Sequence, residues 1–383
     1  PDGDQVVFTV QRIDREKNRY FSHLYLAQIS SGEIRALTQG DVRDTQPCWS
    51  PDGKYIAFQR TKDRESQIWL IPEYGGESHQ LTHLPEGSIG SIAWSPNGSY
   101  LVFEFRQTHP DWTQDARRER ESRNSSDPPR VIDHFHFRAD GLGFLDTYQQ
   151  IWVCLVISGL ARPVTDGDWD ARCPVWSPDS SSIAFISNRS DDPISRPFEE
   201  DIWIVQKEGG ALRKLNSPEG YKQSLSWSPD GKHLAYIGSQ TIEDPWGARN
   251  DRIWILPLGG AAPRCLTESL DRITENASLS DLRGKGNQTP IWTKDSSILY
   301  FLISDRGNCH LYSVNLDAEI KIVVGGNVDI TGFSLGGYQA IVAVLASTAT
   351  QPTEIFTLNL DNGISSALSQ LTNINNPWLE NVR

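Results

Sequence analysis

Trp49-Ser50-Pro51-Asp52-Gly53 leads directly into the apolar run Tyr55-Ile56-Ala57-Phe58. In Pro-Asp-Gly, proline fixes its own φ, aspartate accepts hydrogen bonds from nearby backbone, and glycine adopts positive φ, so the triplet predicts a tight turn. The run after it is short, β-branched and aromatic, which predicts a strand. Because it is almost continuously apolar, we expect this strand to be buried on both faces.

The same pattern recurs along the whole chain in two halves. The first half is the turn and strand, and the second is an apolar strand that ends in a Leu-Thr pair, such as Gln67-Ile68-Trp69-Leu70 through to Leu81-Thr82. Further copies of the first half are Trp94-Ser95-Pro96-Asn97-Gly98, Trp176-Ser177-Pro178-Asp179, Trp227-Ser228-Pro229-Asp230-Gly231, the decayed Trp292-Thr293-Lys294-Asp295, Pro1-Asp2-Gly3, and Phe333-Ser334-Leu335-Gly336-Gly337. Seven first halves therefore alternate with seven second halves.

This repetition predicts an all-β chain, a seven-bladed β-propeller of four-stranded antiparallel blades. A four-stranded sheet cannot bury both faces alone, so each must stack on its neighbours around an axis. The motif tryptophans then act as wedges between blades; the alternative, a carbohydrate-stacking surface, is disfavoured because the ring recurs at one position per repeat. The approximate blades are residues 1–48, 49–93, 94–175, 176–226, 227–291, 292–332 and 333–383.

Uneven spacing locates insertions in this plan. The motif tryptophans at 94 and 176 are 82 residues apart, whereas a bare blade needs about 40–45 residues. We therefore expect a long insertion in the third blade, from about residue 106 to 149, as a functional or mobile excursion. A smaller polar insertion spans residues 271–288, and residues 187–200 extend another loop.

Composition limits the class of protein. The 383 residues carry a formal net charge of -13, which argues against nucleic acid or an anionic membrane as partner. No run of 18 apolar residues occurs, and five cysteines without a CxxC pair favour a reducing, cytoplasmic setting without a zinc or disulfide framework. Because the chain begins inside a repeat, we expect its true N-terminus to lie upstream, which leaves a signal peptide open. The absence of methionine indicates either a biased source or residues dropped from the sequence.

Several side chains are candidates for binding or catalysis. His134 and His136 alternate on one predicted strand face, but no third ligand accompanies them, so we predict no metal site and no cofactor. Glu199-Glu200 lies beside a strand, where paired acids can hold an amino group or simply form a charged rim.

Gly332-Phe333-Ser334-Leu335-Gly336 matches the G-x-S-x-G nucleophile elbow of hydrolases. We reject a catalytic Ser334, because no histidine follows it to complete the Ser…Asp…His order and because it occupies a repeat position, that of Ser50.

The repeats resemble the Pro-Asp repeats shared by the TolB protein and by the N-terminal propeller of the prolyl oligopeptidase family, especially its acylaminoacyl-peptidase-like members. The stretch from Phe137 to Leu145, leading into Gln150-Ile151-Trp152-Val153, resembles the third-blade region of those peptidases. The ending, with Glu354-Ile355-Phe356 and the close Gln370-Leu371-Thr372, resembles their last blade. TolB-type chains typically have six blades, so a count of seven favours the peptidases.

That resemblance implies a function without a catalytic residue in this chain. In that family the propeller caps an α/β-hydrolase domain, which carries the triad and is absent here, and filters its peptide substrates. We therefore expect a non-catalytic gating propeller of a serine peptidase of acylaminoacyl or dipeptidyl type, with Arg138, Glu199 and Glu200 as candidate substrate-binding residues. The expected partners are peptides and the hydrolase domain, with homo-oligomers left open. The alternative is a stand-alone TolB- or WD-type interaction scaffold.

Overall fold

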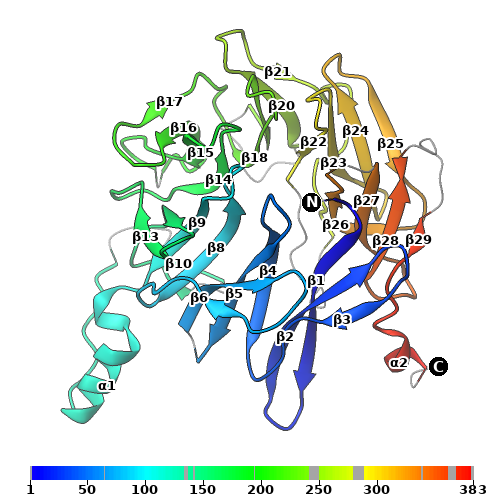
Figure 1. Ribbon diagram of the computed structural model, residues 1–383. Helices are drawn as coiled ribbons and strands as arrows, with labels where there is room; N and C mark the ends of the chain where they lie inside the picture. Colours follow the sequence, from blue (N-terminus) through cyan, green and yellow to red (C-terminus); the bar gives the residue numbers. More distant parts are fainter. Residues whose placement is uncertain are drawn as a thin grey trace.

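The chain folds as a ring of twisted sheets around a central axis, the arrangement of a β-propeller (Figure 1). The computed structural model describes residues 2–63, 65–132, 137–140, 143–193, 195–240, 250–278, 289–337, 340–360 and 368–380. The expected all-β class is confirmed, since the described helices are only one short 3₁₀ turn and two α-helices beside the strands. The first strands β4, β8, β14, β18, β22 and β26 lie nearest the axis.

The N-terminal part of the chain forms a seven-stranded sheet. Its order is β1-β2-β4-β5-β6-β7, with β3 on β2. All neighbours are antiparallel except β2 and β4, which meet in parallel through the single pair Ser22 and Arg43. The strands are β1 (Gln5–Asp14), β2 (Arg19–Gln28), β3 (Ile34–Ala36), β4 (Arg43–Trp49), β5 (Tyr55–Lys62), β6 (Glu65–Pro72) and β7 (His79–Gln80).

Three antiparallel four-stranded sheets follow, in the orders β13-β12-β9-β8, β14-β15-β16-β17 and β18-β19-β20-β21. The first comprises β8 (Gly87–Trp94), β9 (Tyr100–Gln107), β12 (Gln150–Leu155) and β13 (Leu160–Pro163). The second comprises β14 (Arg172–Trp176), β15 (Ser182–Ser187), β16 (Asp201–Gln206) and β17 (Arg213–Lys214). The third comprises β18 (Lys222–Trp227), β19 (His233–Gly238), β20 (Arg252–Pro257) and β21 (Arg264–Cys265).

The C-terminal part forms an eight-stranded sheet. Its order is β22-β23-β24-β26-β27-β28-β29, with β25 on β24. Here too one parallel pair, Cys309 and Asp329, joins two antiparallel groups. The elements are β22 (Ile291–Trp292), β23 (Ile298–Asp305), β24 (Asn308–Asn315), β25 (Ile320–Val324), β26 (Asp329–Leu335), β27 (Ile341–Ser347), β28 (Glu354–Asn359), β29 (Ser369–Gln370) and helix α2 (Asn376–Leu379).

The turn motif builds its own hydrogen-bond network. Ser50 Oγ donates to Asp52 Oδ1 at 2.7 Å and accepts from the backbone N–H of Tyr55 at 3.0 Å. Gly53 adopts φ +72°, as the turn requires. Ser50 is buried, and its hydroxyl supplies the hydrogen-bond acceptor that the backbone N–H of Tyr55, the first residue of the next strand, would otherwise have to find in water.

The Leu-Thr close holds the fourth strand to the third. Thr82 Oγ1 accepts from Ile68 N at 2.9 Å, and Thr165 Oγ1 accepts from Ile151 N at the same distance. Thr38, Thr267 and Thr372 make the same bond in their sheets. The threonine hydroxyl therefore satisfies one backbone donor of the third strand in each of these repeats.

The motif tryptophans lie at the last residue of the first strand of a sheet and reach into the sheet before it. Trp94 Nε1 donates to Cys48 O at 3.1 Å, and Trp176 Nε1 donates to Ala93 O at 3.4 Å. The interpretation of these rings as wedges is confirmed for both, which disfavours the carbohydrate-stacking alternative. The core between sheets is completed by fully buried aromatic rings in the second strands β5, β9, β15, β19 and β23, namely Phe58, Phe103, Phe105, Phe185, Tyr236 and Phe301.

The seventh repeat is offset by one residue from its sequence alignment. Leu335 pairs with Val342 as Trp49 pairs with Ile56, and the backbone N–H of Gly336 bonds Ile341 O as that of Ser50 bonds Tyr55 O. Ser334 thus corresponds to Cys48, and its predicted equivalence with Ser50 was wrong by one position. Since Ser334 lies inside the antiparallel pair β26–β27, it is not on the strand–turn–helix elbow that a hydrolase nucleophile needs.

The long insertion forms a small lobe at the periphery of the ring (Figure 1). It contains a 3₁₀ turn (Pro110–Trp112), helix α1 (Gln114–Ser122) and the pair β10 (Arg138–Ala139) and β11 (Gly143–Phe144). Within the insertion, the charged residues 115–122 are helical, and Thr113 caps the helix by accepting from Ala116 N at 3.2 Å. His134 and His136 lie outside the described residues, as do residues 279–288 of the second insertion.

Candidate functional site

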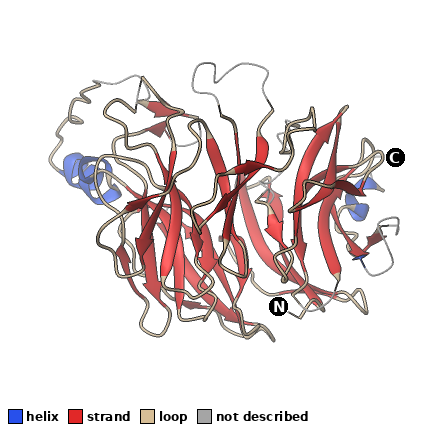
Figure 2. Cartoon of the chain, turned by 90° about the horizontal axis from the view of Figure 1, so that it is seen from above, coloured by secondary structure: helices blue, strands red, loops and turns tan. Residues whose placement is uncertain are grey.

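The long connections gather at one end of the molecule. Two of them join the second strand of a sheet to the third, over residues 108–149 and 188–200, and the described ends of a third connection, residues 239–240 and 250–251, lie at the same end. Because first and second strands are antiparallel, this end is opposite to the Trp-Ser-Pro-Asp turns. Figure 2 shows the longest loops at one end of the strands and the N-terminus near the other. Loops carried on a rigid scaffold are the usual place for binding, so the candidate site lies at this end, which we call the loop end.

Glu200 lies at the loop end in a buried cluster with Arg172 and Lys222. One carboxylate oxygen accepts from Arg172 Nη2, and the other accepts from the backbone N–H of Lys222 at 2.8 Å. Lys222 Nζ is buried and donates to the carbonyl oxygens of Glu200 at 2.6 Å and Gly220 at 3.0 Å. Burial lowers the pKa of Lys222 to about 8. The cluster joins the β14–β17 and β18–β21 sheets, and it occupies the carboxylate that we expected to hold a substrate amino group.

Glu199 has a separate partner. Its carboxylate forms an ion pair with Arg196 at 3.1 Å, while its backbone makes an isolated bridge to Gly220. Successive residues of an extended segment point to opposite sides, so Glu199 and Glu200 do not converge on one point. The acidic pair in the sequence is therefore two carboxylates with different cations.

Arg138 lies in the insertion lobe. It is exposed, and its guanidinium lies 5.8 Å from the centre of the Phe144 ring. Among the described residues, no hydrogen bond or ion pair joins it to Glu199 or Glu200. The lobe itself is held by Arg130, which lies 3.7 Å from the Trp112 ring centre, 4.1 Å from that of Phe144, and pairs with Asp146.

A second group of polar residues at the loop end was not predicted. Tyr221 Oη donates to Gln223 Oε1 at 3.1 Å, and Gln223 Nε2 donates to Glu275 Oε2 at 3.4 Å. Burial raises the pKa of Asp251 to about 6, with smaller contributions from Glu275 and Glu200. Burial also raises the pKa of Tyr221 to about 12. Tyr221 and Gln223 lie at the start of β18, whereas Asp251 precedes β20 and Glu275 follows β21, so no motif could have identified the group.

This arrangement is suited to binding rather than to covalent chemistry. Asp251 and Glu275 supply negative charge, and Tyr221 and Gln223 supply hydrogen bonds. The thiols of Cys48 and Cys154 are unsuited to attack, since desolvation raises the pKa of both to about 12 and the thiolate is the reactive form. Within the described ranges, no group of three or more His, Cys, Asp or Glu side chains could hold a metal ion.

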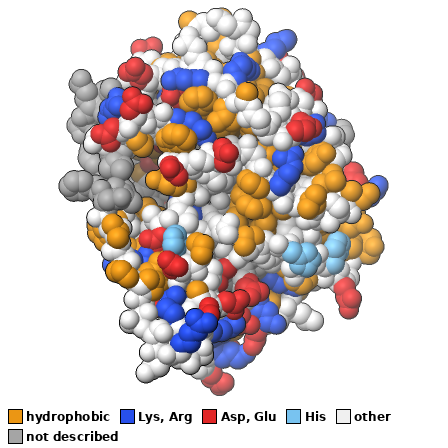
Figure 3. Space-filling model, turned by 90° about the vertical axis from the view of Figure 1, so that its left-hand side faces the viewer, with side chains coloured by type: hydrophobic (Ala, Val, Ile, Leu, Met, Phe, Trp, Pro, Cys, Tyr) orange, Lys and Arg blue, Asp and Glu red, His pale blue; other side chains and the backbone are white. Residues whose placement is uncertain are grey.

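The surface around the lobe has no uniform charge. Figure 3 shows, on the side that lies at the left of Figure 1, acidic and basic side chains intermingled and hydrophobic side chains in several separate patches. Exposed apolar residues concentrate in the insertion lobe, namely Val131, Ile132, Phe137, Phe144 and Tyr148. Neither α-helix in the described part of the chain has the length and apolar character to cross a bilayer.

Comparisons with known proteins identify relatives among peptidases. Residues 1–125 match the family model described as TolB beta propeller domain. Over 366 residues, 94% of this chain, the sequence is 29% identical to the uncharacterized peptidase YuxL of Bacillus subtilis, and the match covers 54% of that protein. The chain spans about half the length of the curated relatives it matches.

Solved structures share the fold. An acylaminoacyl peptidase of Pyrococcus horikoshii has a TM-score of 0.71 at 19% identity, over 99% of this chain and 52% of that one. The β-propeller domain of the trilobed protease of Pyrococcus furiosus has a TM-score of 0.64 at 20% identity, over 98% of this chain and 95% of that one. At these identities the likeness shows the fold, a β-propeller similar to that of TolB and of peptidases.

Proposed function

We propose that this chain is the seven-bladed propeller of a serine peptidase of acylaminoacyl or dipeptidyl type, which filters peptides for an α/β-hydrolase domain outside these residues. The observation that carries the proposal is the match of almost the whole chain to about half of a peptidase. Hydrolysis by such an enzyme would use the hydrolase domain's own serine and an acyl-enzyme. The propeller would contribute exclusion of folded proteins and contacts to the peptide.

The strand pairing supports the count of seven. The seven-stranded sheet divides at its single parallel pair into β1–β3 and β4–β7, and the eight-stranded sheet divides likewise into β22–β25 and β26–β29. With the three four-stranded sheets, this gives seven units in chain order. Among the described strands, no pairing joins β1–β3 to β26–β29.

The loop end supports a place for the peptide. The second polar group, Asp251, Tyr221, Gln223 and Glu275, offers negative charge and hydrogen bonds there, which suits a peptide amino terminus and backbone. We propose that the hydrolase domain covers this end, so that a peptide would reach both the polar group and the catalytic serine. Glu200 would act by holding two blades together through Arg172 and Lys222.

The proposal is tested by assaying two proteins side by side, the 383-residue chain and the product of the complete reading frame. The chain alone should not hydrolyse acylaminoacyl or dipeptidyl chromogenic substrates. The complete product should hydrolyse them and should leave folded proteins uncut. Glu275→Gln in the complete product should raise KM with little change in kcat, and Ser334→Ala should change neither.

Either of two results would overturn the proposal. Turnover by the chain alone would make it an enzyme in its own right. A complete product without peptidase activity would favour the second candidate, a TolB-type interaction scaffold, which the family match and the exposed apolar side chains of the lobe support.

A further inference from the structure

The repeats provide an internal standard for each seam between neighbouring sheets. Trp94, Trp176 and Trp292 each donate their indole N–H to a backbone carbonyl of the preceding sheet, at 3.1, 3.4 and 3.3 Å. In each case the acceptor is the residue before the preceding motif tryptophan. By that rule Trp227 should bond Val175 O. Instead its buried Nε1 has no hydrogen-bond partner in the described part of the chain.

A second regular contact is missing at the same seam. Arg35, Arg162 and Arg264 occupy one position of the outermost strand of a repeat, and each donates to a backbone carbonyl in the outer turn of the next repeat. Arg213 occupies the same position, since it pairs with Ile204 as Arg264 pairs with Ile255. Arg213 is exposed, and among the described residues no hydrogen bond or ion pair engages it. Its guanidinium is therefore available.

One small residue, Ser182, accounts for the two missing contacts at this seam. At two seams the residue six positions after one motif tryptophan packs against the next motif tryptophan, since Tyr100 lies 6.2 Å from Trp176 and His233 lies 6.2 Å from Trp292 between ring centres. The corresponding residue before Trp227 is Ser182. A serine cannot fill the space of a ring, so the seam between β14–β17 and β18–β21 is left open.

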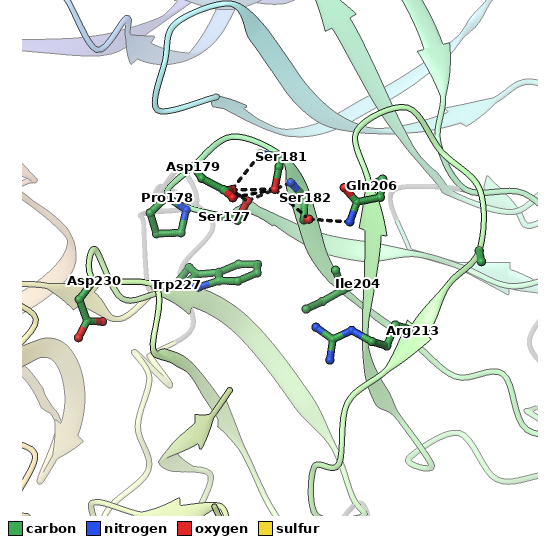
Figure 4. Close-up of a pocket in the computed structure, with 12 residues that line it drawn as sticks. Ser177, Pro178, Asp179, Ser181, Ser182, Ile204, Gln206, Arg213, Trp227 and Asp230 are labelled. Atoms are coloured by element: carbon green, nitrogen blue, oxygen red, sulfur yellow. Dashed lines mark hydrogen bonds between the residues drawn. The ribbon is translucent and has the colours of Figure 1, made fainter. Parts of the chain in front are cut away.

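A cavity of about 520 Å³ occupies this seam. Its lining includes Trp227, Ile204 and Pro178 as apolar walls, with Arg213, Asp179 and Asp230 as charged groups. Figure 4 shows Arg213 on one side of the Trp227 ring and the two aspartates on the other. Hydrogen bonds from Ser177 and Ser228 lower the pKa of Asp179 and of Asp230, so both carboxylates stay charged at neutral pH.

We infer that this seam is a binding site for a small zwitterion with a flat apolar body, the chemistry of a free aromatic amino acid. The ring would stack on Trp227, the carboxylate would pair with Arg213, and the ammonium group would face Asp179 and Asp230. The volume is within the range of small-molecule sites. The cavity is at the end of the strands opposite to the loop end, so this inference is independent of the peptidase assignment.

The test uses L-phenylalanine as probe, with phenylalaninamide and 3-phenylpropionate as analogues that lack one charge each. Binding to the 383-residue chain is measured by saturation-transfer NMR and calorimetry. Phenylalanine should bind with millimolar Kd, and each analogue should bind about tenfold more weakly, as expected for losing one charge-assisted contact.

Two variants separate the site from general surface binding. Ser182→Tyr, which installs the residue found at positions 55 and 100, should abolish binding and raise Tm by filling the cavity. Arg213→Gln should bind phenylalanine about as weakly as the unmodified chain binds phenylalaninamide. The matched control is Arg264→Gln, which should leave binding unchanged because that arginine is at a closed seam.

Three results would overturn the inference. They are no binding of phenylalanine by the unmodified chain, unchanged binding by Ser182→Tyr, and equal affinities of Arg213→Gln and Arg264→Gln. Because Arg213 is exposed and unbonded, its variant should fold even if Ser182→Tyr does not, so the test does not depend on one protein.

Discussion

Single hydroxyl groups define the repeat at the residue scale. Ser95, fully buried, donates to Asn97 Oδ1 at 2.8 Å and accepts from Tyr100 N at 2.9 Å. Ser99, in the same turn, is exposed. The two serines differ in sequence only by position within the motif, yet one closes the turn and the other faces solvent.

Ser95→Ala should therefore destabilise the chain by about 1–2 kcal/mol, because it leaves a buried backbone donor without its acceptor. Urea unfolding followed by fluorescence measures the effect. Ser99→Ala is the matched control and should have no measurable cost. Equal midpoints for the two variants would show that the motif hydroxyl does not stabilise the turn.

Asp251 should make stability depend on pH. Its folded pKa is raised to about 6 from 3.8, so the folded state holds the proton more tightly than the unfolded chain does. The stabilisation is complete below pH 3.8 and is lost as pH rises through about 6.

Asp251→Asn removes this dependence. The Tm of the variant minus the Tm of the unmodified chain should therefore be larger at pH 7.5 than at pH 4. Differential scanning calorimetry at the two pH values measures the gain. Asp63→Asn, at an exposed position, is the control, and its Tm should differ from that of the unmodified chain by the same amount at both pH values. A pH-independent gain for Asp251→Asn would refute the raised pKa.

At the scale of elements, the inner strands β4, β8, β14 and β18 depart from regular pairing at the same place. The partners of Thr45 and Cys48 on β5 are two residues apart, so β4 carries one extra residue, and β8, β14 and β18 do likewise. Gln46, Cys173 and Ser224 adopt positive φ at these bulges. Glu104 steadies two of them by accepting from Ser91 N at 3.0 Å and Cys173 N at 2.6 Å. Such bulges bend a strand, here at the axis.

The insertion lobe is an element whose stability should be separable from the ring. Arg130 lies between two aromatic rings and pairs with Asp146, so Arg130→Ala removes the lobe's central contact. We expect protease cleavage within residues 108–149 to become about tenfold faster, equivalent to about 1.4 kcal/mol of local opening. Global Tm should change little.

Arg117→Ala is the control for the lobe, since that arginine is exposed on helix α1 of the same lobe. Cleavage sites are identified by mass spectrometry after limited trypsin digestion. Cleavage after residues 117 and 130 is left out of the comparison, because each variant lacks one of these two arginines. If Arg130→Ala lowered the Tm of the whole chain instead, the lobe would be part of the cooperative core.

At the scale of the whole molecule, radial stacking follows from strands that are apolar on both faces. Phe58 and Phe185 are fully buried, each in the second strand of its sheet. A single such sheet would expose one apolar face, so neighbours must cover it. The same stacking places loops of one kind at one end, which is why residues as distant as Glu200 and Glu275 both act on the pKa of Asp251.

The sequence by itself determined the turns, the strands after them and their repetition, because proline, glycine, serine and threonine act on backbone within a few residues. The repetition also argued against Ser334 as a nucleophile, although it placed that serine one position out of register. Only the tertiary structure decided what each acid contacts. It showed that Glu200 is bonded to Arg172 and Lys222, while Asp251 and Glu275 belong to a second polar group.

The open seam at Trp227 illustrates the same division. Ser182, in place of a ring, is visible in the repeat alignment. Its consequence depends on the register between two sheets, which brings Ser182, Trp227 and Arg213 to one cavity. Local bonds set the strands, and packing between strands distant in sequence sets the sites, because side-chain partners across a seam are not fixed by any spacing along the chain.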